Sequence, residues 1–165
     1  MKLPDWISEG PDARVFTVRE SVRFRHCDPA GIVFYPRYFE MINDFVETWF
    51  DQALGASFHA LHTQQGIGTP TASIQCDFVS PSRWHDGLVQ HLHVQRLGGA
   101  SVVIGFAFTG EEGGLRLAGR LTVVTVDLKT MRSCRIPDAL RASMTRYLID
   151  PLPAAAGLSS DIQDT

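Results

Sequence analysis

The feature that most constrains the fold is a single broad apolar stripe on a helix near the start of the chain. Apolar side chains recur every three or four residues between positions 38 and 53, and the pattern ends at Gly55. The members of the stripe are Tyr38, Met41, Ile42, Phe45, Val46, Trp49, Phe50 and Ala53. Pro36 suits the first turn of this helix, where a missing N–H leaves no bond unmade. A helix with so wide a stripe must be covered by another apolar layer.

Residues that favour β-structure gather in one segment before this helix and in four segments after it. The segments span residues 15–25, 69–79, 85–97, 100–109 and 115–128. Alternating apolar and polar positions, with β-branched and aromatic side chains, are typical of strands. Glycines at Gly98-Gly99 and within residues 110–114 are typical of hairpin turns. Consecutive hairpins predict an antiparallel sheet.

A short strand at 131–135 and a helix at 137–148 complete the predicted elements. Neither matches the long helix in apolar surface, so the sheet must wrap around that helix to bury both apolar faces. We therefore predict an α+β fold, with a long central helix and an antiparallel sheet of five to six strands.

The chain is expected to form one domain. It has 165 residues, of which 44% are hydrophobic and 20% charged, as is ordinary for a soluble globular protein. Residues 1–14 contain prolines and a glycine and are expected to be an irregular lead-in. Residues 15–150 are expected to form the domain. Residues 151–165 lack a periodic apolar face and are expected to be a loose tail.

Composition also limits the classes of binding partner and the cellular compartment that we expect for this protein. A formal net charge of −3 argues against a nucleic-acid-binding protein. The three cysteines lack the paired short spacings of a zinc site and fit reduced cytoplasmic thiols. We find no signal peptide at the start of the sequence, and no apolar run that approaches the roughly 18 residues of a membrane span. We expect a cytoplasmic protein without a metal, cofactor, nucleic-acid or membrane partner.

The loop between the first strand and the long helix carries the most reactive arrangement. Pro29 restricts Asp28 to extended geometry, while Gly31 permits a positive φ, so the loop can turn sharply. The backbone N–H groups at residues 34–38 begin a helix and lack partners, which places a carboxylate close to an anion site. This pairing indicates acyl chemistry, although an ordinary turn is the alternative interpretation.

The wider loop resembles a known family. The string from Cys27 to Val33, followed by an aromatic pair, Pro36 and Tyr38, resembles the signature of the 4-hydroxybenzoyl-CoA thioesterases of the hotdog-fold superfamily. Gly68-Thr69-Pro70 and the segment 132–137 lie where that family has a Gly-Thr-Pro strand start and a basic run ending in proline. The resemblance implies a hotdog fold, an acyl-CoA substrate, and homodimers with a continuous sheet that often pair into tetramers.

The resemblance also implies roles for particular residues. Asp28 corresponds to the catalytic aspartate, and the backbone N–H of Tyr35 corresponds to the group that polarises the thioester carbonyl. The neighbouring Gly31, Val33 and Phe34 are expected to contact the substrate. These assignments complete a thioesterase site around the loop, since a thioester hydrolase needs a base or nucleophile and donors for the oxyanion.

Three further candidates lie outside the loop. Arg96 and Arg132 match basic positions that contact the nucleotide of coenzyme A in the resembled family, and guanidinium groups are good phosphate partners. Asn43 lies where the family has an acidic residue that meets the para-hydroxyl of the substrate. This departure leaves open which aromatic, short or medium acyl group is bound.

The predicted reaction is hydrolysis of an acyl-CoA thioester, with Asp28 as general base or as nucleophile. Cys27 is a rival nucleophile, and a His91–His93 pair is a rival metal site, but the first lacks a base and the second a third ligand. A non-catalytic acyl-CoA-binding module and a hotdog dehydratase or hydratase are the alternative functions.

Overall fold

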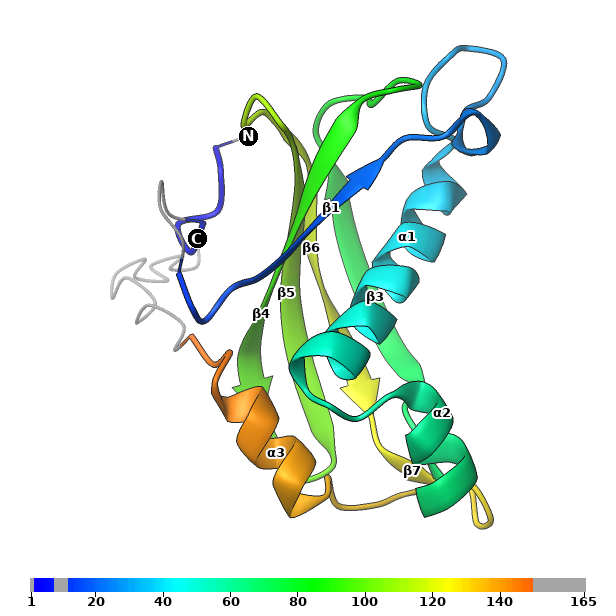
Figure 1. Ribbon diagram of the computed structural model, residues 1–165, viewed down its shortest axis with the longest axis vertical. Coiled ribbons are helices and arrows are strands. Elements are labelled where there is room, and N and C mark those ends of the chain that lie inside the picture. Colours follow the sequence, from blue (N-terminus) through cyan, green and yellow to red (C-terminus); the bar gives the residue numbers. More distant parts are fainter. Residues whose placement is uncertain (1, 8–11, 150–165) are drawn as a thin grey trace, which may run out of the picture.

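The structure is a computed structural model that describes residues 2–7 and 12–149. Its main layer is a five-stranded antiparallel sheet that curves around one long helix (Figure 1). The strand order is β1-β4-β5-β6-β3. The strands are β1 (Phe16–Ser21), β3 (Thr71–Phe78), β4 (Gly87–Leu97), β5 (Ser101–Gly110) and β6 (Leu115–Val124). The predicted α+β arrangement of a long helix and an antiparallel sheet is confirmed.

The central helix α1 (Tyr35–Thr48) continues into a wider turn, η2 (Trp49–Ala53). Trp49 and Phe50 are fully buried, and the rest of the apolar stripe up to Phe50 also lies in the core. This stripe packs on the inward side chains of the sheet, which are mainly Leu88, Leu92, Ile104, Phe106, Phe108, Leu117 and Leu121. Gly55 follows the helix with a φ of 64°, as its position after the last apolar residue predicted.

A smaller group of elements closes one end of the molecule (Figure 1). There β2 (Ile67–Gly68), β7 (Val126–Asp127) and β8 (Arg132–Ser133) form a three-stranded sheet. The helix α3 (Asp138–Thr145) buries Leu140 and Met144 and lies beside β4. These elements leave the opposite end of the molecule to the loop that enters α1.

One sequence-based expectation about the elements was wrong. The first strand ends at Ser21, not at residue 25, because Phe24–His26 form a 3₁₀ turn, η1, that leaves Phe24 75% exposed. This turn is closed by hydrogen bonds between Arg23 and His26, which a periodic pattern does not show. Between α1 and β2, α2 (Phe58–Ala60) and η3 (Leu61–Gln65) are helical and bury Leu61.

The N-terminal segment contributes one aromatic side chain to the body of the protein. The ring of Trp6 lies over the ring of His93 on β4, with 4.2 Å between the ring centroids.

The expected tail at 151–165 lies outside the described residues. Among the helices that the structure describes, none has the length and apolar character needed to cross a membrane.

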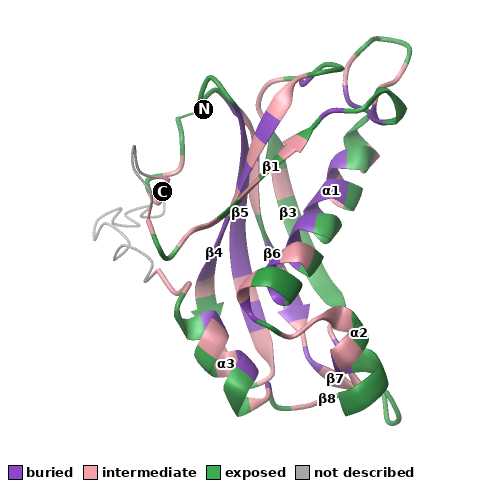
Figure 2. Cartoon of the chain, viewed as in Figure 1, coloured by how far each residue is buried: buried purple, intermediate pink, exposed green. Residues whose placement is uncertain are grey.

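The edge strand β3 is largely exposed (Figure 2). It pairs with β6 on one side, and no other described strand pairs with its second side. Ile74 and Phe78 on this strand are 38% and 47% exposed. An unpaired edge with exposed apolar side chains is a surface on which a further strand can add.

Candidate active site

The loop from residue 23 to residue 34 is closed by backbone hydrogen bonds. The N–H of Asp28 donates to the carbonyl of Ile32 at 3.0 Å, and the N–H of Gly31 donates to the carbonyl of Asp28 at 2.9 Å. Gly31 has a φ of 76°, and a Cβ there would meet no atom within 4 Å. The backbone conformation, not lack of space, therefore favours glycine at this position.

Asp28 is held at the tip of this loop and is half-buried. Its Oδ1 atom accepts a hydrogen bond from the backbone N–H of Ala30 at 2.8 Å. The Oδ2 atom makes no hydrogen bond to the residues that the structure describes. One oxygen therefore fixes the carboxylate, while the other is available to a water molecule or a substrate.

Helix α1 begins directly after the loop. Its N-cap residue, Phe34, has no side chain that can accept a bond from the first N–H groups. The N–H of Phe34 donates to the carbonyl of His26, whereas the N–H of Tyr35 has no partner in the described part of the chain. Tyr35 therefore presents a free donor at the positive end of a helix dipole, which is an arrangement suited to an oxyanion.

An apolar groove of ≈ 470 Å³ lies against this helix start. Its lining comes from the loop, from α1 and from the segment after β3, and consists of Ile32, Val33, Tyr35, Tyr38, Phe78, Val79, Ser80 and Pro81. The Phe78 ring centroid lies 5.8 Å from that of Tyr38 and 6.2 Å from that of Phe39. Burial raises the pKa of Tyr38, so this side chain stays neutral at physiological pH.

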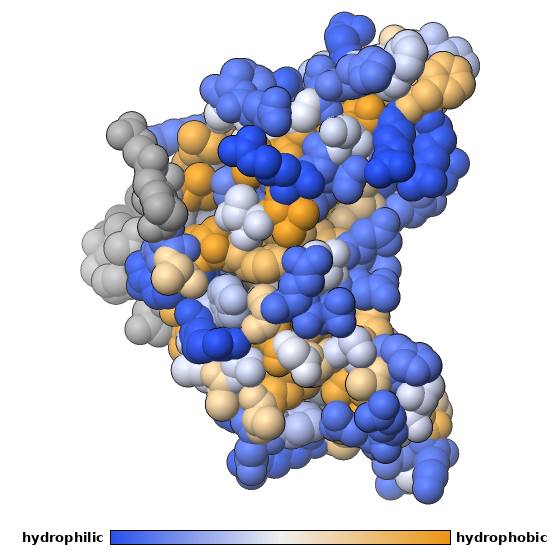
Figure 3. Space-filling view, in the orientation of Figure 1, coloured by the Kyte–Doolittle hydropathy of each residue, from blue (hydrophilic) through white to orange (hydrophobic). Residues whose placement is uncertain are grey.

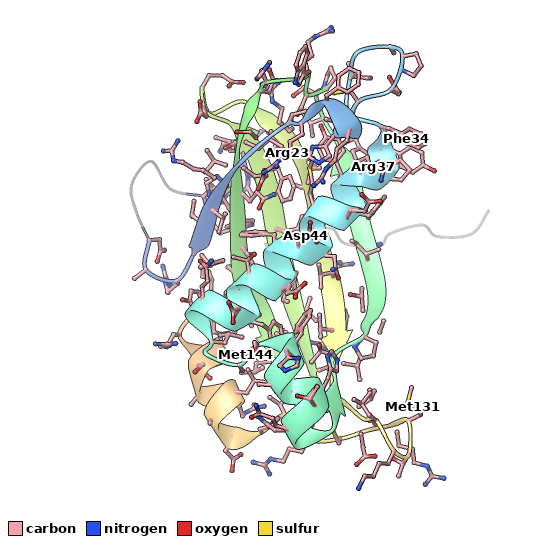
Figure 4. All side chains as sticks on the ribbon, turned by 45° about the vertical axis from the view of Figure 1, so that its right-hand side comes forward. Arg23, Phe34, Arg37, Asp44, Met131 and Met144 are labelled. Atoms are coloured by element: carbon pink, nitrogen blue, oxygen red, sulfur yellow. The ribbon has the colours of Figure 1, made fainter. Side chains whose placement is uncertain are left out.

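Phe34, by contrast, projects away from the core and is 47% exposed (Figure 4). Of the predicted loop contacts, the structure therefore places Val33 and Tyr35 on the groove, and Gly31 and Phe34 beside it.

The thiol of Cys27 does not have the surroundings of a nucleophile. Its Sγ atom lies 4.0 Å from the carbonyl oxygen of Arg23. The neighbouring His26 does not contact it, because the imidazole is directed to the Arg23 N–H and to Arg25. No set of three His, Cys, Asp or Glu side chains capable of holding a metal ion is found within residues 2–7 and 12–149.

The structure does not bring Asn43, Arg96 or Arg132 to Asp28 within one chain. Asn43 is exposed on α1, eight residues after Tyr35, which is about 12 Å along the helix axis. Arg96 is exposed near the far end of β4, about 26 Å along that strand from Leu88. Arg132 is exposed on β8, next to Met131 and at the end of the molecule opposite Phe34 (Figure 4).

Sequence reasoning missed the side of the groove that follows β3. The N–H of Val33 donates to the carbonyl of Ser82 at 2.9 Å, and Ile32 forms a bridge with Arg83. Phe78 packs on the same aromatic side chains of α1. The only sequence signal was an aromatic residue at the end of a strand, followed by a polar segment with a proline, which gives no hint of its partner.

Comparison with known proteins identifies the family. The sequence matches the family model described as the Thioesterase-like superfamily over residues 22–144. The chain belongs to this superfamily. The superfamily match includes the loop with Asp28, the whole of α1, and the strands β3, β4, β5 and β6 of the main sheet. It begins directly after β1.

One relative is similar at the sequence level over part of the chain. The 4-hydroxybenzoyl-CoA thioesterase of Pseudomonas sp. (strain CBS-3) is 31% identical over 77 residues. The match covers 46% of this chain and 55% of the relative, so the chain spans about half of that relative's length.

Solved structures of thioesterases share the fold. Slr0204 from Synechocystis, a 1,4-dihydroxy-2-naphthoyl-CoA thioesterase, gives a TM-score of 0.74 at 17% identity, over 79% of this chain and 96% of its own. A thioesterase-superfamily protein from Jannaschia sp. CCS1 has a TM-score of 0.77 and 22% identity, and the match covers 87% of this chain and 99% of that one. The gentisyl-coenzyme A thioesterase BH1999 has a TM-score of 0.70 and 24% identity, and the match covers 78% of this chain and 99% of that one. The expected hotdog fold and thioesterase family are confirmed.

Proposed function

We propose that this protein hydrolyses an acyl-CoA thioester to the free acid and coenzyme A. The observation that carries the proposal is a loop that fixes the carboxylate of Asp28, pairs Asp28 with Ile32 on the wall of an apolar groove, and leads into the free N–H of Tyr35. Membership of the thioesterase-like superfamily supports it.

In the proposed reaction, the carbonyl oxygen of the thioester accepts a hydrogen bond from the Tyr35 N–H. Asp28 then takes a proton from a water molecule whose oxygen attacks the carbonyl carbon. Collapse of the tetrahedral intermediate breaks the C–S bond, and the coenzyme A thiolate that leaves takes up the proton held by Asp28. In the alternative route, Asp28 attacks the carbonyl itself, the C–S bond breaks to release the coenzyme A thiolate, and water then hydrolyses the resulting mixed anhydride.

The groove favours an aromatic acyl group. Tyr35, Tyr38 and Phe78 contribute aromatic surface to it, and aromatic rings bind well to such surfaces. The related enzymes named above act on 4-hydroxybenzoyl, 1,4-dihydroxy-2-naphthoyl and gentisyl thioesters, which supports the same class here.

We further propose that the active form is a homodimer, or a dimer of such dimers, in which a second copy completes the site. The exposed β3 edge offers unpaired backbone groups next to the groove, and strand pairing across it would cover Ile74 and Phe78. Because Asn43, Arg96 and Arg132 are exposed on other elements than the Asp28 loop, we propose that these side chains act on the substrate of a partner copy.

A structural neighbour that binds coenzyme A supports the proposed acyl-CoA substrate. SAV2348 from Staphylococcus aureus, solved in complex with CoA, gives a TM-score of 0.77 at 17% identity. A second hollow of ≈ 540 Å³ is a poor site for the phosphates, because Asp44, Glu47 and Asp51 line it. The free thiols of Cys27, Cys76 and Cys134 fit the cytoplasmic location that we propose.

A thiol-release assay across acetyl-, hexanoyl-, benzoyl- and 4-hydroxybenzoyl-CoA tests the function. We expect turnover of at least the aromatic thioesters, and loss of turnover in D28N. Tight binding of acyl-CoA without hydrolysis would instead support a non-catalytic binding module. Reversible addition of water to an enoyl-CoA would support a hydratase.

A further inference from the structure

We propose that His26 is a positioning residue for the Asp28 loop, and that it holds the loop in its catalytic shape only while its imidazole is neutral. The proposal rests on the proposed thioesterase function, since it assigns a purpose to the loop that carries the carboxylate. His26 does not touch the groove, so its role is to place the residues that do.

His26 connects the end of the first strand to the start of α1. Its ring Nδ1 accepts a hydrogen bond from the N–H of Arg23 at 3.0 Å. Its own N–H donates to the carbonyl of Arg23 at 2.9 Å, and its carbonyl accepts from the N–H of Phe34 at 2.9 Å. The residue is 7% exposed. Asp28 lies two residues after His26, and Tyr35 directly follows Phe34.

The two ring nitrogens set the condition on protonation. Nδ1 faces the Arg23 N–H at 3.0 Å, and Nε2 faces the Nε of Arg25 at 3.3 Å. A neutral imidazole has one acceptor nitrogen, so it can satisfy the shorter backbone contact. An imidazolium has no acceptor nitrogen. Its two N–H groups would then face the N–H of Arg23 and the Nε–H of Arg25, which are also donors. Protonation therefore removes the hydrogen bond that fixes the loop.

The surroundings make protonation unfavourable but physically accessible. His26 lines a cavity of ≈ 110 Å³ between β1 and α1, large enough for solvent to deliver a proton. Arg23, which follows the end of β1, and Asp44 on α1 both line this cavity and are labelled in Figure 4. The charged groups that face His26 are Arg23 and Arg25 from its own turn, Glu20 from β1, and Arg37 and Asp44 from α1, while β4 contributes the neutral Gln90.

Cations predominate among these groups. Burial lowers the pKa of His26, and Arg25 adds to this effect, whereas Glu20 opposes it. Because the pKa in the folded protein lies below the ordinary 6.5, folding excludes a proton that the unfolded chain accepts. The contribution of His26 to stability is therefore complete above pH 6.5 and declines as the pH falls toward the lowered pKa.

Two variants separate the ring's hydrogen bond from its charge. In H26N the Oδ1 atom replaces Nδ1 at the same number of bonds from the backbone, so it can accept from Arg23 but cannot be protonated. In H26A the acceptor is lost. H59N, at an exposed histidine on α2, is the matched control.

The first readout is amide hydrogen exchange without substrate, expressed as protection relative to the intrinsic rate at each pH. We expect the wild-type Arg23 and Phe34 amides to lose protection as the pH falls through the lowered pKa of His26. H26N should stay protected throughout, H26A should be unprotected at every pH, and H59N should match the wild type. Wild-type protection of both amides in H26A would overturn the positioning role, and a wild-type pH profile in H26N would overturn the requirement for a neutral ring.

The second readout is turnover. Misplacing catalytic groups by about 1 Å costs up to about 100-fold, so H26A should lower kcat by roughly 10- to 100-fold with little change in KM. The kcat ratio of H26N to wild type should rise as the pH falls through the lowered pKa of His26, because only the wild-type ring loses its acceptor nitrogen there. If neither protein turns over any thioester while exchange behaves as expected, the proposed function fails and the positioning role stands. If H26A does not fold, the exchange and turnover profiles of H26N decide the outcome.

Discussion

The ring of Phe78 lies 6.3 Å from the ring of Tyr35, at 75° between their planes, although 43 residues separate them in sequence. This edge-on contact joins the exposed edge strand β3 to the first turn of α1. It places aromatic surface directly beside the backbone N–H that we assign to the oxyanion. On the face that Figure 3 draws, apolar residues are interspersed with hydrophilic ones.

Replacing Phe78 by Ala should therefore weaken binding of aromatic substrates selectively. Loss of one aromatic contact costs about 0.5–1.5 kcal/mol beyond the lost area, so KM for benzoyl-CoA should rise about threefold to tenfold or more. KM for acetyl-CoA should change little. F24A is the matched control, because Phe24 is an exposed aromatic residue that packs on Trp84, away from the groove. Equal effects of F78A on both substrates would contradict the assignment.

The sequence was sufficient to predict those features that depend on neighbouring residues. The stripe of α1 repeats over several turns, and the order from Asp28 to Tyr35 places a carboxylate next to a helix start. The contact of Phe78 with Tyr35 could not be predicted in this way, because it depends on how β3 packs across α1. The 3₁₀ turn at Phe24 was missed because alternation favoured a strand, while the deciding hydrogen bond of His26 is made within the turn.

Arg132 tests the contribution that we expect from a second copy. R132A should raise KM for acyl-CoA about 10- to 150-fold, since a hydrogen bond to a charged group contributes about 1.5–3 kcal/mol. KM for the corresponding acyl-pantetheine, which lacks the nucleotide, should stay unchanged. K129A removes a nearby exposed cation that we do not assign to the site, and it should leave both values unchanged. Equal losses on the two substrates in R132A would remove this residue from the nucleotide site.

His93 should make the protein less stable in mild acid. Burial beneath Trp6 lowers its pKa to about 4, so the unfolded chain binds a proton between pH 6.5 and 4 that the folded protein excludes. The free energy of unfolding should fall over this range by up to about 3 kcal/mol from this residue. Urea unfolding at pH 7, 5 and 4 should show a smaller loss in H93Q than in wild type. H59Q, at an exposed histidine, should match the wild type, and an unchanged slope in H93Q would contradict the prediction.

The carboxylate of Asp28 is the central claim, and D28N tests it most directly. Asn keeps the shape of the side chain but cannot act as a base or as a nucleophile, while C27S alters the neighbouring thiol. Loss of a general base costs about 10²- to 10⁴-fold in rate, so kcat of D28N on the best acyl-CoA should collapse while acyl-CoA affinity and folding stay near wild type. C27S should retain nearly full kcat. A folded D28N that keeps more than about a tenth of wild-type kcat, a loss too small for a missing base, would show that Asp28 is not the catalytic group.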